Sequence, residues 1–244
     1  MSYREFTPAA ELSRLVACTW ERTVPPVGAA PVRVLPDGCV DLVWRAGDLF
    51  LAGPDTKAVM SPIGPGETVV GLRLRPGAAG GVLGLPASEL VDTRPVLTAV
   101  LGRAGAEVAE RVGTAGAPAH ARGVLEDFVR VRLVEVGEPD ELVLAATRLL
   151  GRPASRVGSL ARVLPLGERQ RLRRFKAAVG YGPKTLDRVL RFQRFLALAP
   201  AAGAGEVGLA RAAAELGYAD QAHLSRECLR LSGLTPSALA AGGA

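Results

Sequence analysis

The stretch LGYADQAHLSRECLRLSGLTPSAL (residues 216–239) decides how the second half of this chain folds. Gly217 permits a tight turn, and Asp220 is a residue type that caps the start of a helix. Apolar side chains then recur at helical spacing, at Leu224, Cys228 and Leu231. Thr235 and Pro236 predict the start of one more helix, by capping and by proline in the first turn.

Residues 207–216 predict a short helix directly before this turn. Two helices joined by a tight turn that contains glycine are typical of a helix-turn-helix, whose second helix enters the major groove of DNA. The outward face of the second helix carries Gln221, Ala222, Ser225 and Arg226. Arginine can pair with guanine and glutamine with adenine, so these residue types fit base reading.

An upstream passage repeats this plan. Ser155 is a candidate cap for a short helix over 157–163, and Pro165 with Gly167 would end that helix. A second helix begins near Glu168. Its apolar stripe is Leu172, Phe175 and Val179, and a different face carries Arg169, Arg173 and Lys176. A bundle of helices would explain the apolar stripes, but not two units that each present base-reading residue types.

A long helix is expected to join the two passages. The segment 180–183 breaks the first unit, 184–198 predicts the long helix, and 200–206 predicts a flexible break. Positive charge is concentrated here, because residues 140–236 hold 16 Lys and Arg against 8 Asp and Glu, whereas the rest of the chain holds 14 against 16. Such a distribution suits phosphate-backbone binding, although a solvated basic surface would give the same count.

The C-terminal residues resemble the AraC/XylS-type regulators. Residues 216–239 resemble the second helix-turn-helix of that family, with 217–221, 224–227 and 234–236 as the specific parts, and residues 140–198 resemble the first. The resemblance implies two recognition helices that enter successive major-groove segments on one face of DNA. The base-reading residues it implies are Arg169, Arg173, Gln221, Ala222, Ser225 and Arg226. The phosphate contacts it implies are Lys176, Lys184, Arg230 and the helix start at Thr235.

Several positions depart from the family pattern. Gly167 stands where the family has a serine that caps the first recognition helix. Arg171 followed by Leu172 reverses the usual order of leucine and polar residue, so the helix is rotated or Leu172 is placed against DNA. Cys228 replaces a large aromatic residue, and a small buried packing role is expected for it. These departures favour the second helix as the main determinant of specificity.

The first half of the chain predicts β structure. In 33–44, Val40, Leu42 and Trp44 share one face and Asp41 lies on the other. In 68–77, Val70, Leu72 and Leu74 lie opposite Arg73 and Arg75. Helices are then expected over 83–91, 95–112 and 122–136, with a linker at 114–121 and a break at 137–140. The fold class is therefore α+β, with a mainly β N-terminal domain (1–136) and an all-α DNA-binding domain (137–244).

Residues 33–44 and 71–79 also resemble the N-terminal domain of one subgroup of the same family. This resemblance implies a cupin-like domain for effector sensing or self-association. The two histidines, His120 and His223, match no cupin metal site, so neither metal nor cofactor is expected. Asp37, Asp41, Arg73 and Arg75 are candidates for a ligand pocket, although a turn at 36–38 and a cross-strand pair of Asp41 with Arg73 explain them more simply.

The expected function is sequence-specific DNA binding in transcription regulation, not catalysis. DNA-alkyl transfer, which some proteins with this helix-turn-helix pair perform, needs a cluster of zinc-bound cysteines, and Cys18, Cys39 and Cys228 are dispersed. A helical scaffold without DNA binding is the other alternative. The start of the chain lacks signal-peptide features and no stretch is apolar enough for a membrane span, so the cytoplasm, at the nucleoid, is expected. Expected partners are double-stranded DNA and, as further candidates, a small-molecule effector and RNA polymerase, with the chain as monomer or homodimer.

Overall fold

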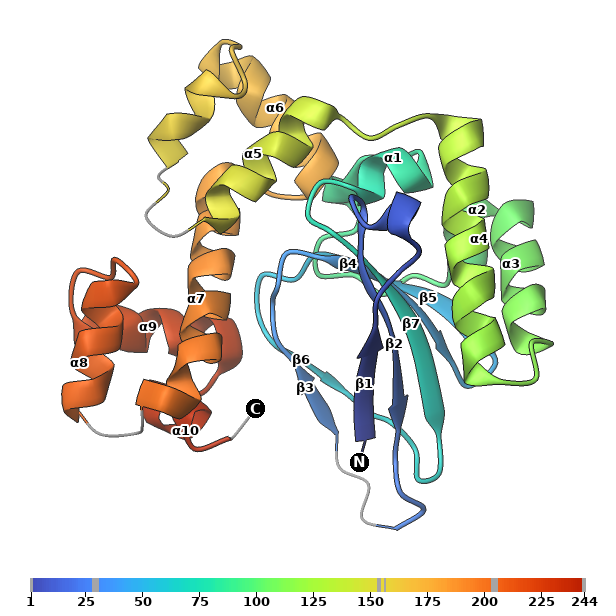
Figure 1. Ribbon diagram of the computed structural model, residues 1–244, viewed down its shortest axis with the longest axis horizontal. Coiled ribbons are helices and arrows are strands. Elements are labelled where there is room, and N and C mark those ends of the chain that lie inside the picture. Colours follow the sequence, from blue (N-terminus) through green and yellow to red (C-terminus); the bar gives the residue numbers. More distant parts are fainter. Residues whose placement is uncertain (1, 28–30, 153–154, 156, 203–205, 243–244) are drawn as a thin grey trace.

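The computed structural model describes residues 2–27, 31–152, 155, 157–202 and 206–242. Strands occupy the N-terminal part of the chain, and every element after residue 74 is a helix. Figure 1 shows a β-sheet with helices along one side, and a separate group of helices that makes up the C-terminal part. The expected α+β class, with a mainly β domain followed by an all-α domain, is confirmed.

The main sheet has five antiparallel strands in the order β1-β2-β7-β4-β5. The strands span β1 Ser2–Phe6, β2 Val16–Thr23, β7 Thr68–Leu74, β4 Val40–Arg45 and β5 Asp48–Ala52. A second, two-stranded sheet pairs β3 (Val32–Val34) with β6 (Val59–Ser61). This small sheet, which we call the flap, lies beside the C-terminal helices in Figure 1.

Alternation along the strands divides the main sheet into two faces. Leu42, Leu72 and Leu74 are fully buried against the helices that cover one face, as the period-two pattern predicts. The covering helices are α1 (Ala79–Leu83), α2 (Leu97–Leu101), α3 (Arg103–Gly113) and α4 (Pro118–Val136). The other face, which carries Asp41 and Arg73, turns away from this core.

Three helix boundaries in the N-terminal domain differ from the sequence expectation. No helix spans 83–91: α1 ends at Leu83 because Gly84 adopts φ +75°, and only a 3-10 turn follows at Ala87–Glu89. The expected helix over 95–112 is split into α2 and α3 at Gly102, which has φ +54°. The expected linker at 114–121 is shorter, because α4 already begins at Pro118.

The C-terminal helices are α5 (Glu141–Gly151), α6 (Glu168–Val179), α7 (Pro183–Ala202), α8 (Glu206–Glu215), α9 (Gln221–Ser232) and α10 (Pro236–Ala240), with a 3-10 helix at Val157–Arg162. Ser155 does not cap that 3-10 helix; its Oγ donates to Leu149 O and Arg152 O at the end of α5. The expected break at 200–206 begins later, because α7 continues to Ala202, and residues 203–205 lie outside the described part of the chain.

Along the chain, the change from the first hydrophobic core to the second occurs around α5, the helix that follows α4. α4 ends at Val136, and Asp140 caps α5 by accepting from the backbone N–H groups of Leu142 and Val143. The first core contains side chains of the β-strands, of α1–α4 and of one α5 residue, Leu144, and the second contains side chains of the remainder of α5, of the 3-10 helix at Val157–Arg162 and of α6 to α10. We therefore keep the domain division at 136–137 as a proposal.

The C-terminal helices are packed directly on the N-terminal domain. Ala58 N donates to Leu231 O at 2.7 Å, and Arg33 Nη1 donates to Ser232 O at 2.9 Å, so the flap holds the end of α9. Gln193 Nε2 on α7 donates to Pro36 O at 2.6 Å. Every one of these contacts joins a helix of the second core to a loop or strand beside the open face of the main sheet.

Candidate nucleic-acid interface and ligand cavity

Helix α9 is built as the sequence predicts. Asp220 caps it by accepting from His223 N at 2.5 Å, and Gly217 turns the chain with φ +73°. Leu224, Cys228 and Leu231 are buried, as expected. The positions expected to read bases lie on the other side, where Ala222 and Arg226 are exposed and Gln221 and Ser225 are half-buried.

The end of this unit is also as expected. Thr235 Oγ1 accepts from Ala238 N at 3.2 Å and Pro236 occupies the first turn of α10. Arg230, near the end of α9, is exposed. Thr235, like Arg230, is exposed, so both positions expected to contact phosphate are open to solvent.

Helix α6 presents a basic face but differs from the expectation at its centre. Arg169, Arg173 and Lys176 are exposed, and Phe175 and Val179 are buried. Leu172 was expected in the buried stripe and is instead 41 % exposed. It lies between Arg169 and Lys176 on the helix surface, within the basic face itself.

Arg171 explains why Leu172 is turned outward. Its Nη1 donates to Leu164 O at 3.3 Å and to Leu166 O at 3.2 Å. The guanidinium therefore takes the inward position and binds carbonyl oxygens at the end of the preceding turn, next to Gly167, which provides no side-chain cap to α6. The exchange of Arg171 and Leu172 thus moves the apolar residue into the surface that also carries the cations.

Helix α7 joins the two units and is paired with α9 through one arginine and one glutamate. Arg188 on α7 makes two hydrogen bonds to the Glu227 carboxylate on α9, at 2.7 and 3.1 Å, and both side chains are largely buried. A paired arginine and carboxylate of this kind fixes orientation as well as distance. Lys184, in the first turn of α7, remains exposed.

A cavity of about 560 Å³ lies over the open face of the main sheet. Its floor consists of alternate residues of the five strands, among them Tyr3, Trp20, Asp41, Phe50 and Arg73. The flap forms a second wall, and Gln193 and Leu196 of α7 close a third side. Its volume lies within the ordinary range for small-molecule sites.

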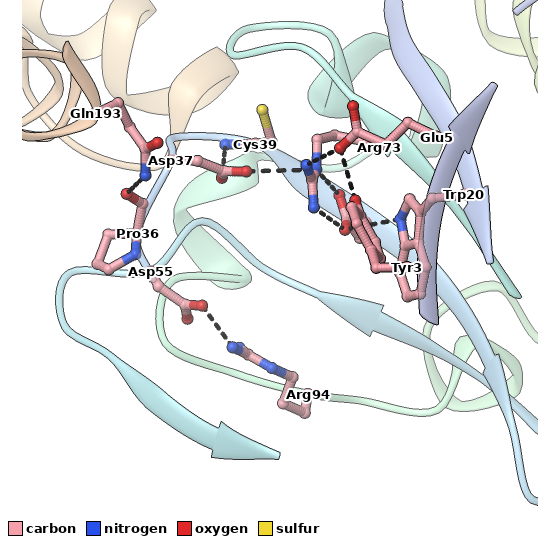
Figure 2. A network of polar contacts seen from close by, with 11 residues as sticks. Tyr3, Glu5, Trp20, Pro36, Asp37, Cys39, Asp55, Arg73, Arg94 and Gln193 are labelled. Atoms are coloured by element: carbon pink, nitrogen blue, oxygen red, sulfur yellow. Dashed lines mark hydrogen bonds and ion pairs between the residues drawn. The ribbon is translucent and has the colours of Figure 1, made fainter. Parts of the chain in front are cut away.

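Arg73 occupies the centre of the polar end of this cavity (Figure 2). Its guanidinium is shared by three carboxylates: Asp41 Oδ1 at 3.1 Å, Asp37 Oδ2 at 3.3 Å and Glu5 Oε1 at 3.4 Å. The cross-strand pair of Asp41 with Arg73 is confirmed, since the two residues are partners in the β4–β7 ladder. Burial and the nearby charge of Asp37 raise the pKa of Asp41 to about 6, although Arg73 acts in the opposite direction.

Trp20 lies flat on the floor of the cavity. A Cβ atom at Gly71 would come within 2.2 Å of the indole ring, so only glycine allows the ring to lie against β7. Trp20 Nε1 donates to Asp41 Oδ2 at 3.1 Å, and the Tyr3 ring is tilted beside it with centroids 5.9 Å apart. These rings make an aromatic surface next to the carboxylates (Figure 2).

A fourth carboxylate lines the opposite side of the cavity. Asp55 Oδ2 accepts from Arg94 Nη2 at 2.5 Å, while Asp55 Oδ1 is buried with no partner among the described residues. Burial raises the pKa of Asp55, against the effect of Arg94. Figure 2 shows this pair facing the Arg73 cluster across the site.

The three cysteines lie in separate parts of the fold and form no disulfide. Cys18 lies in β2, Cys39 lines the cavity and Cys228 is buried in α9. Burial raises the pKa of Cys18 to about 11 and of Cys228 to about 12, and it raises that of Cys39 as well. An alkyl-accepting cysteine needs the opposite shift. Within the described ranges, no group of His, Cys, Asp and Glu is placed to hold a metal ion.

Two known families match separate stretches of the chain. Residues 160–242 match a family described as a helix-turn-helix domain, and residues 4–95 match one described as a domain of unknown function (DUF6597). The first match covers both units, from the 3-10 helix before α6 to the end of α10. Residues 160–242 therefore form a helix-turn-helix domain. The chain is a DNA-binding transcription regulator.

Solved structures of ToxT from Vibrio cholerae are similar to the regulator at the level of the whole chain. An apo ToxT structure has 13% sequence identity and a TM-score of 0.47, covering 91% of this chain and 96% of that one. ToxT in a P21 crystal form and ToxT bound to (E)-4-(8-methylnaphthalen-1-yl)but-3-enoic acid have 10% and 9% identity, each with a TM-score of 0.45 and 98% of both chains covered. No curated protein sequence matches the regulator significantly.

The structure separates the four residues that the sequence suggests for a ligand pocket. Asp37, Asp41 and Arg73 line the cavity together. Arg75 does not, because β7 ends at Leu74 and the Arg75 side chain turns to Ser13 O at 3.0 Å. Sequence reasoning missed Trp20 and Gln193; the apolar alternation in β2 could have placed Trp20, but nothing local to α7 predicts that Gln193 reaches the sheet.

Proposed function

We propose that the regulator binds double-stranded operator DNA with α6 and α9 in successive major-groove segments of one face. The observation that carries this proposal is the pair of exposed helix faces, Arg169–Arg173–Lys176 on α6 and Ala222–Arg226 on α9, joined by one helix. The buried Arg188–Glu227 pair supports a fixed spacing between the two. We assign base reading to Arg169, Arg173, Gln221, Ala222, Ser225 and Arg226, and phosphate contact to Lys176, Lys184, Arg230 and Thr235.

The cavity is proposed as the effector site. It is walled by both domains, and its two C-terminal wall residues, Gln193 and Leu196, lie on the helix that joins the recognition units. The flap, another wall, is hydrogen-bonded to the end of α9. A ligand that fills the cavity would therefore contact α7 directly and would contact the flap, which is bonded to α9. Effector control needs a ligand whose contacts differ between two arrangements of the protein, and contacts to α7 and the flap would differ if α7 and α9 moved.

Among the described helices, none is long and apolar enough to cross a membrane. We propose action at the nucleoid in the cytoplasm, as monomer or homodimer, with RNA polymerase as a further partner. These proposals follow from regulation of transcription rather than from a particular surface of the chain.

The DNA assignment is tested by measuring affinity for an operator obtained by site selection from random DNA with the full chain. Replacing Arg226 with Ala should weaken operator binding by roughly 1–3 kcal/mol and relax base preference at one position. Replacing Lys176 with Ala should weaken binding to all sequences alike. It should also lower by about one the number of ions released on binding, which is obtained from the dependence of log affinity on log salt concentration. Fluorescence anisotropy at several KCl concentrations distinguishes the two effects.

Arg103→Ala provides the matched control, since Arg103 is an exposed arginine on α3, in the other domain. It should change neither affinity nor salt dependence. Normal operator binding by Arg226→Ala would show that α9 is misassigned. Equal affinity of the unmodified chain for operator and random DNA would instead contradict sequence-specific regulation as a whole.

A further inference from the structure

The cavity contains more negative than positive charge at its polar end. Glu5, Asp37 and Asp41 all contact the single guanidinium of Arg73. Three carboxylates around one guanidinium give the surroundings of Arg73 a local formal excess of two negative charges, although the whole lining has five arginines and four carboxylates. This local excess favours a cation that comes close to the three carboxylates.

The other arginines that line the cavity are engaged with protein atoms. Arg94 pairs with Asp55, Arg33 binds Ser232 O, and Arg45 binds Pro62 O at 2.6 Å. Arg22 lies over the Tyr3 ring, with its Cζ 4.9 Å from the ring centroid. An anionic ligand would have to compete with these contacts.

Asp55 provides a second and separate indication. Its side chain is only 7% exposed, and within the described part of the chain its Oδ1 atom accepts no hydrogen bond. A buried carboxylate oxygen without a donor is costly, and a rotation of the Asp55 side chain that exposes Oδ1 to a donor on a ligand would remove that cost. The unsatisfied capacity is for accepting a hydrogen bond, as a cationic N–H group requires.

The aromatic and apolar residues of the cavity lining indicate the chemistry of the uncharged part of the ligand. Trp20 and Tyr3 offer ring faces next to the carboxylates, and Phe50, Val59 and Leu196 supply apolar walls. Ring faces attract cations as well as apolar groups. An ammonium or amidinium group on an aromatic or apolar body would match both parts of the cavity.

We propose that the cavity binds a small organic cation, an amine or amidine with an aromatic or apolar body, whose charged group lies between the Asp37–Asp41 carboxylates and Asp55. Calling this cation the effector rests on the proposed function. Its binding does not, because occupancy can be measured without DNA. Failure of the cation and failure of DNA binding are therefore distinguishable.

The test measures occupancy through Trp20 fluorescence in the full chain. The sequence has two tryptophans, and Trp44 lies on the other face of the sheet beside Gly113, so a Trp44→Phe background leaves Trp20 as the reporter. Two probe pairs share a body, differ in charge and carry no indole ring that would obscure Trp20: 2-phenylethylamine with 3-phenylpropanoate, and octylamine with nonanoate. Thermal shift of the unmodified chain provides a second readout.

We expect at least one amine to quench Trp20 saturably and to bind about tenfold or more tightly than its matched carboxylate, which corresponds to about 1.4 kcal/mol. Asp37→Asn and Asp55→Asn should each weaken the amine by about tenfold, the second while retaining an oxygen for Arg94. Asp127→Asn, a change on α4 outside the cavity, should leave the affinity unaltered.

Two results would overturn the proposal. One is tighter binding of the carboxylates than of the amines. The other is no saturable amine response up to about 10 mM, far weaker than ordinary effector affinities. Circular dichroism of each variant without ligand separates a lost site from a lost fold, and if Asp37→Asn does not fold, Asp55→Asn carries the same test.

Discussion

At the scale of single residues, the exchange of Arg171 and Leu172 alters the exposed face of α6, the face that we propose to contact DNA. Arg171 binds carbonyl oxygens at the end of the preceding turn, and Leu172 is 41% exposed among the cations. An apolar side chain in a major groove has one favourable partner, the methyl group of thymine. We therefore expect Leu172 to select thymine at one operator position.

The prediction is tested with operators in which single thymines are replaced by deoxyuridine, which lacks only the methyl group. For the unmodified chain, one such replacement should weaken binding by about 0.8 kcal/mol, the value of one buried CH₂-sized group. Leu172→Ala should lose that sensitivity while it retains sensitivity elsewhere. If Leu172→Ala and the unmodified chain respond alike at every thymine, Leu172 does not contact the base.

A contact between two residues was predictable from the sequence where the residues lie opposite each other on paired strands or within one turn of a helix. The Asp41–Arg73 pair follows from period-two alternation in two strands, and the Asp220 cap follows from local residue types. For Leu172 the sequence left two outcomes open, a rotated helix or an outward leucine, because the carbonyls that bind Arg171, Leu164 O and Leu166 O, lie outside α6. Arg75 was misplaced for a similar reason, since Ser13 O lies 62 positions away along the chain.

At the scale of elements, the flap holds the end of the second recognition helix. Arg33 and the backbone of Ala58 donate to the last two carbonyls of α9, Ser232 O and Leu231 O. A cation at the C-terminal end of a helix is favourable, so this contact stabilises α9 as well as joining it to β3. Helix ends that are set by glycine were harder to predict from the sequence. The helical spacing of apolar residues continues across Gly84 and Gly102, although the helices end there.

Arg33→Met should loosen this connection while keeping the length of the side chain. We expect a loss of about 1–2 kcal/mol in the free energy of unfolding, as for a hydrogen bond with a charged donor, and faster amide exchange at Ala58. Arg45→Met is the matched control, because Arg45 supports the flap side through Pro62 O and Ser61 Oγ. Arg45→Met should leave the rate of amide exchange at Ala58 nearly unchanged. If that rate is also unchanged in Arg33→Met, Arg33 does not hold the flap to α9.

At the scale of the whole molecule, the two domains share an interface that the sequence does not reveal. Gly80 of α1 allows close packing against α6: a Cβ atom there would lie 3.3 Å from Ala177 O and 3.6 Å from Ala178 Cα. Gly180, after α6, likewise approaches Pro54 and Val91 of the N-terminal domain. Periodicity within a segment predicts which of its faces is apolar, but not which distant segment covers that face. The sequence therefore predicted the two helix-turn-helix units, but not that they pack on the N-terminal domain.

This interface predicts that the domains unfold together. Calorimetry of the full chain should give one transition, because the loss of either core removes the partner surface of the other. Gly80→Leu should place a side chain between α1 and α6 and separate the transition into two. Gly123→Leu is the control, since Gly123 lies on α4 with open space around its Cβ position, and leucine there should stabilise the helix by roughly 0.5–1 kcal/mol. Two transitions in the unmodified chain would contradict the coupling, and the cavity could then not act on α7 and α9 through a shared, rigid interface.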